Sequence, residues 1–460
     1  MRQRWSNWAG NQAATGIDIR HPRDAADVSA LVVDAVRVGR RVRPVGSGHS
    51  FSAIAQPIDV QVVLDQCADL IRIDAVSGLV TVGAGMTLAR LNRLLTRAGL
   101  AMTNLGDVDV QTVAGALATG THGTGTRFGG LATQVRALEI VLADGSIHEC
   151  SPTHDSESFA AASIGLGALG IVTAVTLQTV PLFALRAEES PIPLDDVLAG
   201  FDELIEAPDH AEFFWFPHTA RTLVKSNTRV PVDGGLRPLS RLRRWHDDEL
   251  LSNTVFGGLL ATGRRFPGLI RPINRVSSRA LGARTFTDLS HAVFTSPRRV
   301  RFVEMEYAVP RSELVAVVRE LRNAIERSGL RISMPVEVRT AAPDNIPLST
   351  SYGRESGYVA VHMERGSSPD EYFALVESIV GAVDGRPHWG KMHTRSADEF
   401  RGLYPRFDDF LAVRDAVDPG GVFANRYLDR VLGSAPGAVP TWSSTPGQTT
   451  DSCPGGVDRF

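Results

Sequence analysis

The sequence Arg43-Pro44-Val45-Gly46-Ser47-Gly48-His49-Ser50-Phe51 decides how the rest of the chain is interpreted. Glycines at alternate positions permit positive φ and carry no Cβ, so a ligand can approach the backbone closely. Successive free N–H groups in such a loop form an anion site, and the ring of His49 can reach the same ligand. Taken alone, the stretch is equally compatible with a strand-to-loop turn that ends in a surface histidine.

Two more glycine-rich stretches lie further along, at residues 104–125 and 165–170. The last one satisfies the pattern G-x-G-x-x-G, but a dinucleotide fingerprint needs a strand before the glycines and a helix after them. Here a helix-like segment, 158–164, precedes the glycines and a strand-like segment, 171–178, follows them, which argues against a Rossmann site. The three loops together indicate extensive backbone contact with a phosphate-bearing ligand.

Composition indicates a globular protein of two domains. The chain has 460 residues, of which 43% are hydrophobic and 22% charged. The net charge of -3 gives no footprint for nucleic acid or for an anionic membrane. The three cysteines lack metal-ligand spacing, and the N-terminus lacks the apolar region of a signal peptide. We expect a cytoplasmic protein without a membrane-spanning helix, and peripheral attachment to a membrane stays open.

Periodicity predicts secondary structure along most of the chain. Helices are expected at 25–35 after Asp24, at 88–95 after Thr87, at 158–164, at 314–325, and after a capping box at Ser368-Pro369-Asp370-Glu371. Strands are expected at 41–45, 61–65, 79–82, 138–142, 171–178, 212–216 and 301–307. Residues 232–285 are predicted to be a loosely helical insertion, and Ser434–Phe460 a disordered tail.

The segment Pro44–Ser50 resembles the flavin-attachment loop of FAD-linked oxidoreductases of the vanillyl-alcohol oxidase (p-cresol methylhydroxylase-type) family. The similarity covers roughly residues 5–430, and the spacing of its separate motifs argues against chance. Within that family, the sequence resembles most the sugar-acid lactone branch, which comprises the L-gulono- and D-arabinono-1,4-lactone oxidoreductases and has the alditol oxidases as near relatives. Its further motifs are Ala114–Gly125, Glu337-Val338-Arg339, Pro387–Lys391 and Asp418–Leu428.

The resemblance implies an α+β fold. An FAD-binding domain of two subdomains is expected at 1–182, and a cap domain built on an antiparallel sheet at 183–390. Residues 391–433 are expected to return to the flavin site, and 434–460 to be the tail.

The resemblance also implies a covalent cofactor, with a ring nitrogen of His49 bonded to the 8α-methyl carbon of FAD. A noncovalent flavin beside a bystander histidine is the alternative. The other cofactor-binding residues that it implies are Val45, Gly46, Ser47, Gly48, Ser50, Phe51, Gly106, Asp107, Val113, Gly115, Thr119, Gly120, His122, Gly123, Gly170, Ile171, Val172 and Lys391. For His122, a ring bonded only to the backbone is an equal alternative.

Four residues are candidates for catalysis. Glu337 and Arg339 are two apart, so in a strand both side chains lie on one face, where they can bind sugar hydroxyls or simply form an ion pair. Lys391 follows a glycine and can stabilise an anionic reduced flavin, or it is a solvated surface charge. A histidine at the position of His362 lines the substrate pocket of alditol oxidases, but it can equally be structural here.

The implied reaction is oxidation of a sugar-acid 1,4-lactone by hydride transfer to FAD, giving an ascorbate-type product. Oxygen or a separate cytochrome or quinone would reoxidise the flavin. Gly106 has no Cβ and is expected to leave a path for oxygen, whereas relatives with alanine there react poorly with oxygen. The alternatives are an alditol oxidase that gives an aldose and hydrogen peroxide, and a flavin-storing protein without turnover. Asp107 stands where alditol oxidases usually have serine, which argues against an acyclic polyol.

Overall fold

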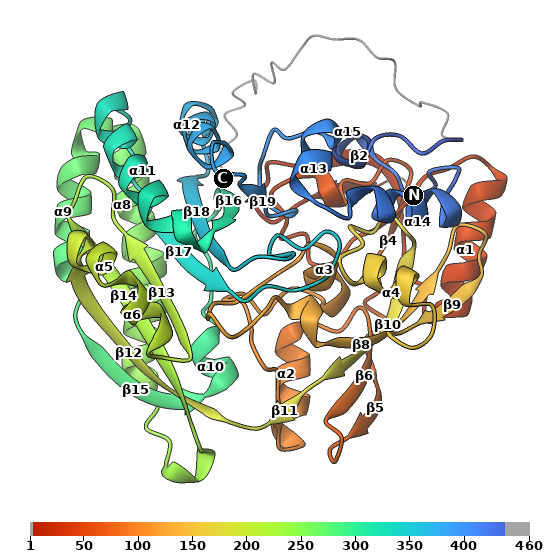
Figure 1. Ribbon diagram of the computed structural model, residues 1–460, viewed down its shortest axis with the longest axis horizontal. Helices are drawn as coiled ribbons and strands as arrows, with labels where there is room; N and C mark the ends of the chain where they lie inside the picture. Colours follow the sequence, from red (N-terminus) through yellow and green to blue (C-terminus); the bar gives the residue numbers. More distant parts are fainter. Residues whose placement is uncertain (1–2, 438–460) are drawn as a thin grey trace, which may run out of the picture.

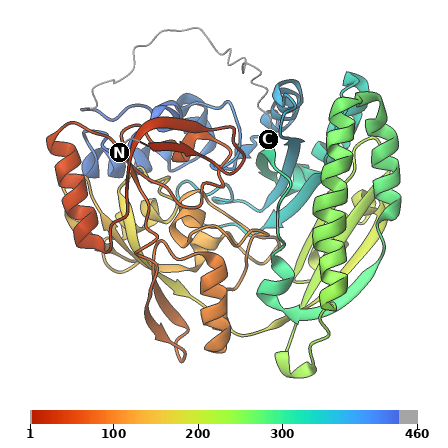
Figure 2. The same ribbon diagram turned by 180° about the vertical axis from the view of Figure 1, so that it is seen from behind.

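The computed structural model describes residues 3–437, which form two halves of mixed sheet and helix lying side by side (Figure 1). The N-terminal part of the chain and its last helices make up one half, and the middle of the chain makes up the other. The view from behind shows the same division (Figure 2).

The first half contains a four-stranded sheet of order β1-β2-β4-β3, a five-stranded sheet of order β5-β6-β10-β8-β9 and a short β7–β11 pair. Its strands are β1 Gln3–Ser6, β2 Ala13–Arg20, β3 Val42–Pro44, β4 Val60–Val62, β5 Leu70–Asp74, β6 Leu79–Gly83, β7 Leu100–Ala101, β8 Val135–Val141, β9 Ile147–Cys150, β10 Ile171–Gln178 and β11 Val180–Pro181. Its first helices are α1 Ala25–Arg37, α2 Leu88–Arg97, α3 Val113–Ala118 and α4 Ser156–Ser163. Asp24 and Thr87 cap α1 and α2 as predicted, each accepting the N–H three residues further on.

The second half is built on an antiparallel sheet of order β15-β12-β14-β13-β17-β18-β16-β19. Its strands are β12 Ala184–Pro193, β13 His210–Trp215, β14 Arg221–Val230, β15 Arg284–Leu289, β16 Phe302–Pro310, β17 Val336–Ala341, β18 Ser356–Glu364 and β19 Arg386–Pro387. Its helices are α5 Leu194–Ala199, α6 Phe201–Glu206, α7 Arg241–Arg244, α8 Phe256–Arg265, α9 Ile270–Ala280, α10 Ser290–Phe294, α11 Leu314–Ser328 and α12 Asp370–Gly381.

Alternation along the central strands gives this sheet one apolar face and one charged face. In β16, Val303, Met305 and Tyr307 join a core with side chains of α5, α6, α11 and α12. Because successive side chains of a strand point to opposite faces, Glu304 and Glu306 point away from those helices. β17 repeats the pattern, with Val336 and Val338 in the core. The charged face is therefore free to form a site.

The last part of the chain packs against the first half. Helices α13 Ala397–Leu403, α14 Phe407–Val417 and α15 Arg426–Leu432 contribute Phe400, Phe407 and Tyr427 to the same core as strands β6, β8 and β10. Just before them, the carbonyl of Gly390 accepts a hydrogen bond from Phe51 N–H at 2.6 Å. The segment after β19 thus contacts the end of the glycine-rich loop 43–51.

The capping box predicted at Ser368–Glu371 is wrong. Helix α12 begins at Asp370, and Pro369 occupies the N-cap position without a side-chain cap. The hydroxyl of Ser368 donates to Asp370 Oδ2 at 2.9 Å, which ties it to the residue two further on. A capping box does form at Ser396 and Glu399, at the start of α13.

Two other sequence predictions concern the insertion and the tail. Residues 232–285 contain α7, a π-helix at Trp245–Val255, α8 and α9, so the insertion is helical until β15 begins at Arg284. Among the first residues of the predicted tail, Ala435 is buried and Gly437 N–H donates to Pro419 O at 2.9 Å. The remainder of the predicted tail, 438–460, lies outside the described residues. Between residues 3 and 437, no helix has the length and apolar content to cross a bilayer.

Candidate functional site

A cavity of about 310 Å³ lies between the two sheets of the first half, and all three glycine-rich stretches line it. The loop at 46–50 presents five consecutive backbone N–H groups that have no hydrogen-bond partner among the described residues. Gly48 has a φ of +68°, and a Cβ on Gly46 would lie 2.4 Å from Thr112 Oγ1. The loop is therefore open to an anion and closely packed behind.

Arg43 ties the glycine-rich stretches together. Its buried guanidinium donates to Ile54 O, Gly167 O and Phe423 O at 2.8, 2.8 and 2.9 Å, and also to Leu166 O. It thus joins the first loop, the third glycine stretch and the C-terminal segment at one wall of the cavity. These bonds to backbone carbonyls hold the three segments in place at that wall.

The cavity fits FAD. Free N–H groups suit a pyrophosphate, and apolar side chains suit flat rings. The apolar lining includes Leu138, Ile140, Leu166, Leu169 and Val172. The predicted residues Val45, Gly46, Ser47, Gly48, Ser50, Gly115, Thr119, Gly170 and Val172 all line this cavity.

His49 lies where this cavity meets a second one, because it lines both. Its ring stacks on Trp8 with centroids 5.0 Å apart. Burial, together with the charge of Lys391, lowers the pKa of His49 to about 4. The imidazole is therefore neutral at pH 7, as a nucleophile must be, and no described residue hydrogen-bonds to it.

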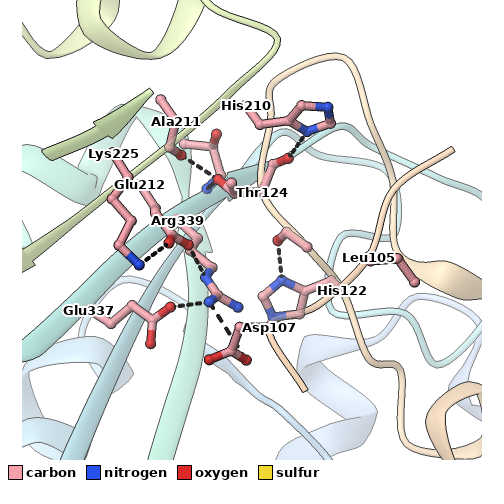
Figure 3. Close-up of polar contacts among 12 residues, drawn as sticks. Leu105, Asp107, His122, Thr124, His210, Ala211, Glu212, Lys225, Glu337 and Arg339 are labelled. Carbon is pink, nitrogen blue, oxygen red and sulfur yellow. Dashed lines mark hydrogen bonds and ion pairs between the residues drawn. The ribbon is translucent and has the colours of Figure 1, made fainter. Parts of the chain in front are cut away.

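The second cavity, of about 160 Å³, lies between the first half and the charged face of the large sheet. Glu337 and Arg339 of β17 line it and contact each other (Figure 3). Arg339 also donates through Nε to Glu212 Oε2 at 2.8 Å, and its Nη2 lies 3.8 Å from Asp107 Oδ1. The guanidinium is thus shared among three carboxylates, as the same-face spacing of the pair permits.

The charges set the protonation states in this cavity. Burial raises the pKa of Glu337 to about 7, although Arg339 acts in the opposite direction. Burial also acts to raise the pKa of Asp107, but the guanidinium groups of Arg298 and Arg339 hold it well below its usual range. Glu337 can therefore exchange a proton near neutral pH while Asp107 stays ionised.

Lys391 and His362 meet at a second carboxylate. Lys391 Nζ lies 2.5 Å from Glu304 Oε1, and His362 Nε2 lies 3.6 Å from the same oxygen. Burial lowers the pKa of each cation, but the nearby glutamates outweigh it and raise both pKa values. Lys391 is thus a paired cation at the cavity wall, not a solvated surface charge.

His122 forms the backbone contact that was one of its two alternatives, and it also faces the second cavity. Its Nδ1 lies 2.8 Å from Gly123 O, and its ring stacks on Tyr358 and lines the second cavity. Its Nε2 lies 3.4 Å from Glu306 Oε2.

Phe51, Gly106, Asp107 and His122 line the second cavity, and Gly123 lines a smaller neighbouring one. Val113, Gly120 and Ile171 line neither of the two main cavities. The side chains of Val113 and Ile171 pack in the cores on either side of the first cavity.

Sequence reasoning missed several charged residues of the second cavity. Glu304 and Glu306 of β16 have the same two-residue spacing as Glu337 and Arg339, and this signal could have found them. Glu212 belongs to a predicted strand, but nothing in the sequence indicated that it would contact Arg339. Arg298 lies in a loop without periodicity, so no local signal marked it.

The family model for D-arabinono-1,4-lactone oxidase matches residues 175–431, and a model for an FAD binding domain matches residues 19–151. The chain is 39% identical to an L-gulono-1,4-lactone dehydrogenase of Mycobacterium tuberculosis, over 93% of this chain and 99% of that protein. It is 34% identical to a bovine (Bos taurus) L-gulonolactone oxidase, over 93% of this chain and 98% of that protein. An alditol oxidase of Streptomyces is 32% identical, over the same shares.

Among solved structures, a cholesterol oxidase from B. sterolicum superposes with a TM-score of 0.81 at 17% identity, covering 94% of this chain and 97% of that one. This likeness concerns the fold alone. The sequence matches go further, since they span nearly the whole chain. The chain belongs to the D-arabinono-1,4-lactone oxidase family, within the FAD-linked oxidoreductases of vanillyl-alcohol oxidase type.

Proposed function

We propose that the protein oxidises a sugar-acid 1,4-lactone, of the L-gulono or D-arabinono type, with covalent FAD as oxidant. The observation that carries the proposal is the position of neutral His49. It lies between a cavity suited to a dinucleotide and a cavity lined by Glu337, Arg339 and Lys391. In this arrangement residues 1–182 bind the cofactor, 183–390 bind the lactone, and 391–433 bring Lys391 back to it.

Bound FAD supplies a two-electron oxidant that accepts a hydride from the substrate carbon. Glu337 takes the proton of the hydroxyl group on the carbon beside the lactone carbonyl, for which a pKa near neutrality is well matched. Arg339 orients the sugar hydroxyls, and Lys391 balances negative charge that develops in the cavity. Loss of one proton and one hydride leaves a ketone beside the lactone carbonyl, which enolises to an ascorbate-type product.

The covalent bond to His49 is part of this proposal. His49 would hold FAD through a ring nitrogen bonded to the 8α-methyl carbon, and the lowered pKa keeps that imidazole neutral, as such a bond requires. Stacking on Trp8 holds the ring at the junction of the two cavities.

The test is anaerobic mixing of the purified holoprotein with L-gulono- or D-arabinono-1,4-lactone. The visible flavin band should bleach, and the recovered product should be two hydrogen atoms lighter than the lactone. A flavin band that no lactone bleaches would favour a flavin-storing protein, and bleaching by xylitol alone would favour an alditol oxidase.

Either oxygen or a cytochrome or quinone can take the electrons, and Gly106 is the residue that bears on the choice. A Cβ there would lie 3.1 Å from His122 O and 3.4 Å from Thr121 Cγ2, so alanine narrows the cavity at that point. We expect the natural protein to be reoxidised by oxygen in stopped flow, and Gly106→Ala to be reoxidised more slowly. Equal rates would place the gate elsewhere, and no reoxidation at all would point to a protein or quinone acceptor.

We also propose that the helical insertion attaches the protein to anionic membrane surfaces. Its sequence carries more arginines than acidic residues, and basic residues together with exposed apolar side chains favour binding at an anionic membrane surface. Those apolar side chains are Leu236, Leu242, Trp245, Leu251, Val255, Phe266, Leu269 and Val276. The natural protein should sediment with vesicles of anionic lipid, and the double variant Trp245→Ser/Phe266→Ser should stay in the supernatant. Equal recovery of the two proteins in the supernatant would contradict this proposal.

A further inference from the structure

Arg298 lies on the loop between α10 and β16, and its side chain lines the second cavity. We propose that Arg298 binds the carbonyl oxygen of the lactone and so selects lactones over polyols. The inference rests on the proposed function, and it assigns a recognition group for the one part of the substrate that polyols lack.

Arg298 has more free donors than the other cations of the cavity. A guanidinium carries five N–H donors and no acceptor. Within residues 3–437, the only hydrogen bond of the Arg298 side chain is from Nη2 to Asp107 Oδ2, and the side chain is 36% exposed. By contrast Arg339 contacts Glu337, Glu212 and Asp107, and Lys391 contacts Glu304.

The chemistry of a lactone matches this free guanidinium. A hydroxyl group both donates and accepts, so it can face the carboxylates of the cavity. A lactone carbonyl only accepts, so it needs a donor, and a charged donor gives the stronger hydrogen bond. Asp107 stays ionised and accepts from Nη2 of the Arg298 guanidinium, which leaves the other N–H donors of that group for the carbonyl.

The loop that carries Arg298 is held from both sides. Ser296 N–H donates to Asp107 O at 3.0 Å. Asn253 Nδ2 donates to Pro297 O at 3.2 Å, and Asn253 Oδ1 accepts from Arg299 N–H at 2.8 Å. One buried amide therefore binds the residues immediately before and after Arg298.

Asn253 belongs to the π-helix of the insertion, at 245–255. π-helical turns are rare in proteins, and many of those that do occur lie at functional sites. The insertion, for which the sequence alone gave no role in the site, thereby positions a substrate-binding arginine. Asn253 is a positioning residue, because its amide contacts the loop and it does not line the second cavity.

The test measures binding without turnover, using the full-length holoprotein. A 2-deoxyhexono-1,4-lactone lacks the hydroxyl that is oxidised, and the matching 1,4-anhydro-2-deoxyhexitol has CH₂ in place of the carbonyl. Isothermal titration of both ligands is compared for the natural protein, Arg298→Gln and the control Arg301→Gln, whose exposed side chain is outside the cavity lining. Flavin spectrum and Tm report whether each variant is folded.

Arg298→Gln should weaken lactone binding by about tenfold or more, and leave the affinity for the anhydrohexitol within about twofold. Arg301→Gln should change neither. Unchanged lactone affinity in Arg298→Gln, or equal losses for both ligands, would overturn the inference while leaving the proposed function intact. A natural protein that binds neither ligand and is not reduced by any lactone would overturn both.

Asn253→Ala should lose part of the same lactone affinity, and the double variant Asn253→Ala/Arg298→Gln should be no weaker than Arg298→Gln alone. Additive losses would show that Asn253 acts on the site by another route and would overturn its positioning role.

Discussion

His49 and Glu337 are single residues whose protonation the surroundings control. Burial makes His49 a weaker base and Glu337 a weaker acid than in water. Both shifts suit the proposed chemistry, since one residue must stay neutral to attack and the other must exchange a proton near pH 7.

Replacing His49 with alanine should release the flavin. Acid-precipitated natural protein should stay yellow, because a covalent bond survives unfolding, and His49→Ala should leave all flavin in the supernatant. The exposed histidine His21 serves as control, and His21→Ala should keep a yellow pellet. Free flavin from the natural protein would contradict the covalent attachment.

The rate of flavin reduction by the lactone should rise with pH through about 7. Glu337 has to be deprotonated to accept the substrate proton, so the active form is the one that predominates above its pKa. Glu337→Gln should remove this rise and slow the reaction by more than about tenfold, or about 1.4 kcal/mol of transition-state stabilisation. The exposed Glu320 provides the control Glu320→Gln.

A rate that falls as the pH rises through 7, or a Glu337→Gln profile like that of the natural protein, would show that another group takes the proton. His362 would then be the next candidate, since it lines the same cavity.

Among the secondary-structure elements, periodicity in strands made part of the site predictable. Glu337 and Arg339 could be paired from sequence because a period of two fixes a common face. Partners that come from other strands or from loops, such as Glu212 and Arg298, depend on sheet order and loop path. Neither follows from local periodicity, so the sequence indicated the shared face of Glu337 and Arg339 but not the other carboxylates around Arg339.

Packing of the glycine loop against helix α3 gives a prediction at this scale. A Cβ on Gly46 would meet Thr112 Oγ1 at 2.4 Å, and this oxygen caps α3 by accepting from Gly115 N–H. Gly46→Ala should therefore lower the ratio of flavin to protein. The double variant Gly46→Ala/Thr112→Ala should recover part of the flavin content, because the clashing oxygen is gone. Its free energy of unfolding should be lower by about 1 kcal/mol, because α3 loses its N-cap.

The control is Gly402→Ala, at a position where an added Cβ meets nothing within 4 Å. It should keep full flavin content. If Gly46→Ala also kept it, the loop would not be as tightly held against α3 as the structure indicates.

For the whole molecule, sequence motifs indicated the α+β fold and the family, but not every boundary. The low apolar content after Gly433 predicted a tail, yet Ala435 is buried and Gly437 bonds to Pro419. Composition averages over a segment and cannot reveal that its first few residues dock on a neighbouring turn.

Truncation should distinguish these two parts of the predicted tail. A chain that ends after Gly437 should keep its flavin, activity and Tm, since residues 438–460 are too polar to bury much surface. A chain that ends after Gly433 should have a lower Tm, because it loses the buried Ala435 and the bond to Pro419. Loss of flavin from the longer chain would show that residues 438–460 contribute to the fold.

The central claim is that a hydride leaves the carbon beside the lactone carbonyl and enters the flavin held at His49. Anaerobic stopped-flow flavin reduction by L-gulono-1,4-lactone, with hydrogen or deuterium on that carbon, tests it most directly. We predict that the lactone bleaches the flavin and that deuterium slows the bleaching several-fold. Equal rates for the two isotopologues would mean that this carbon–hydrogen bond is not broken in the reduction step. Bleaching by xylitol, but by neither L-gulono- nor D-arabinono-1,4-lactone, would contradict the claim outright.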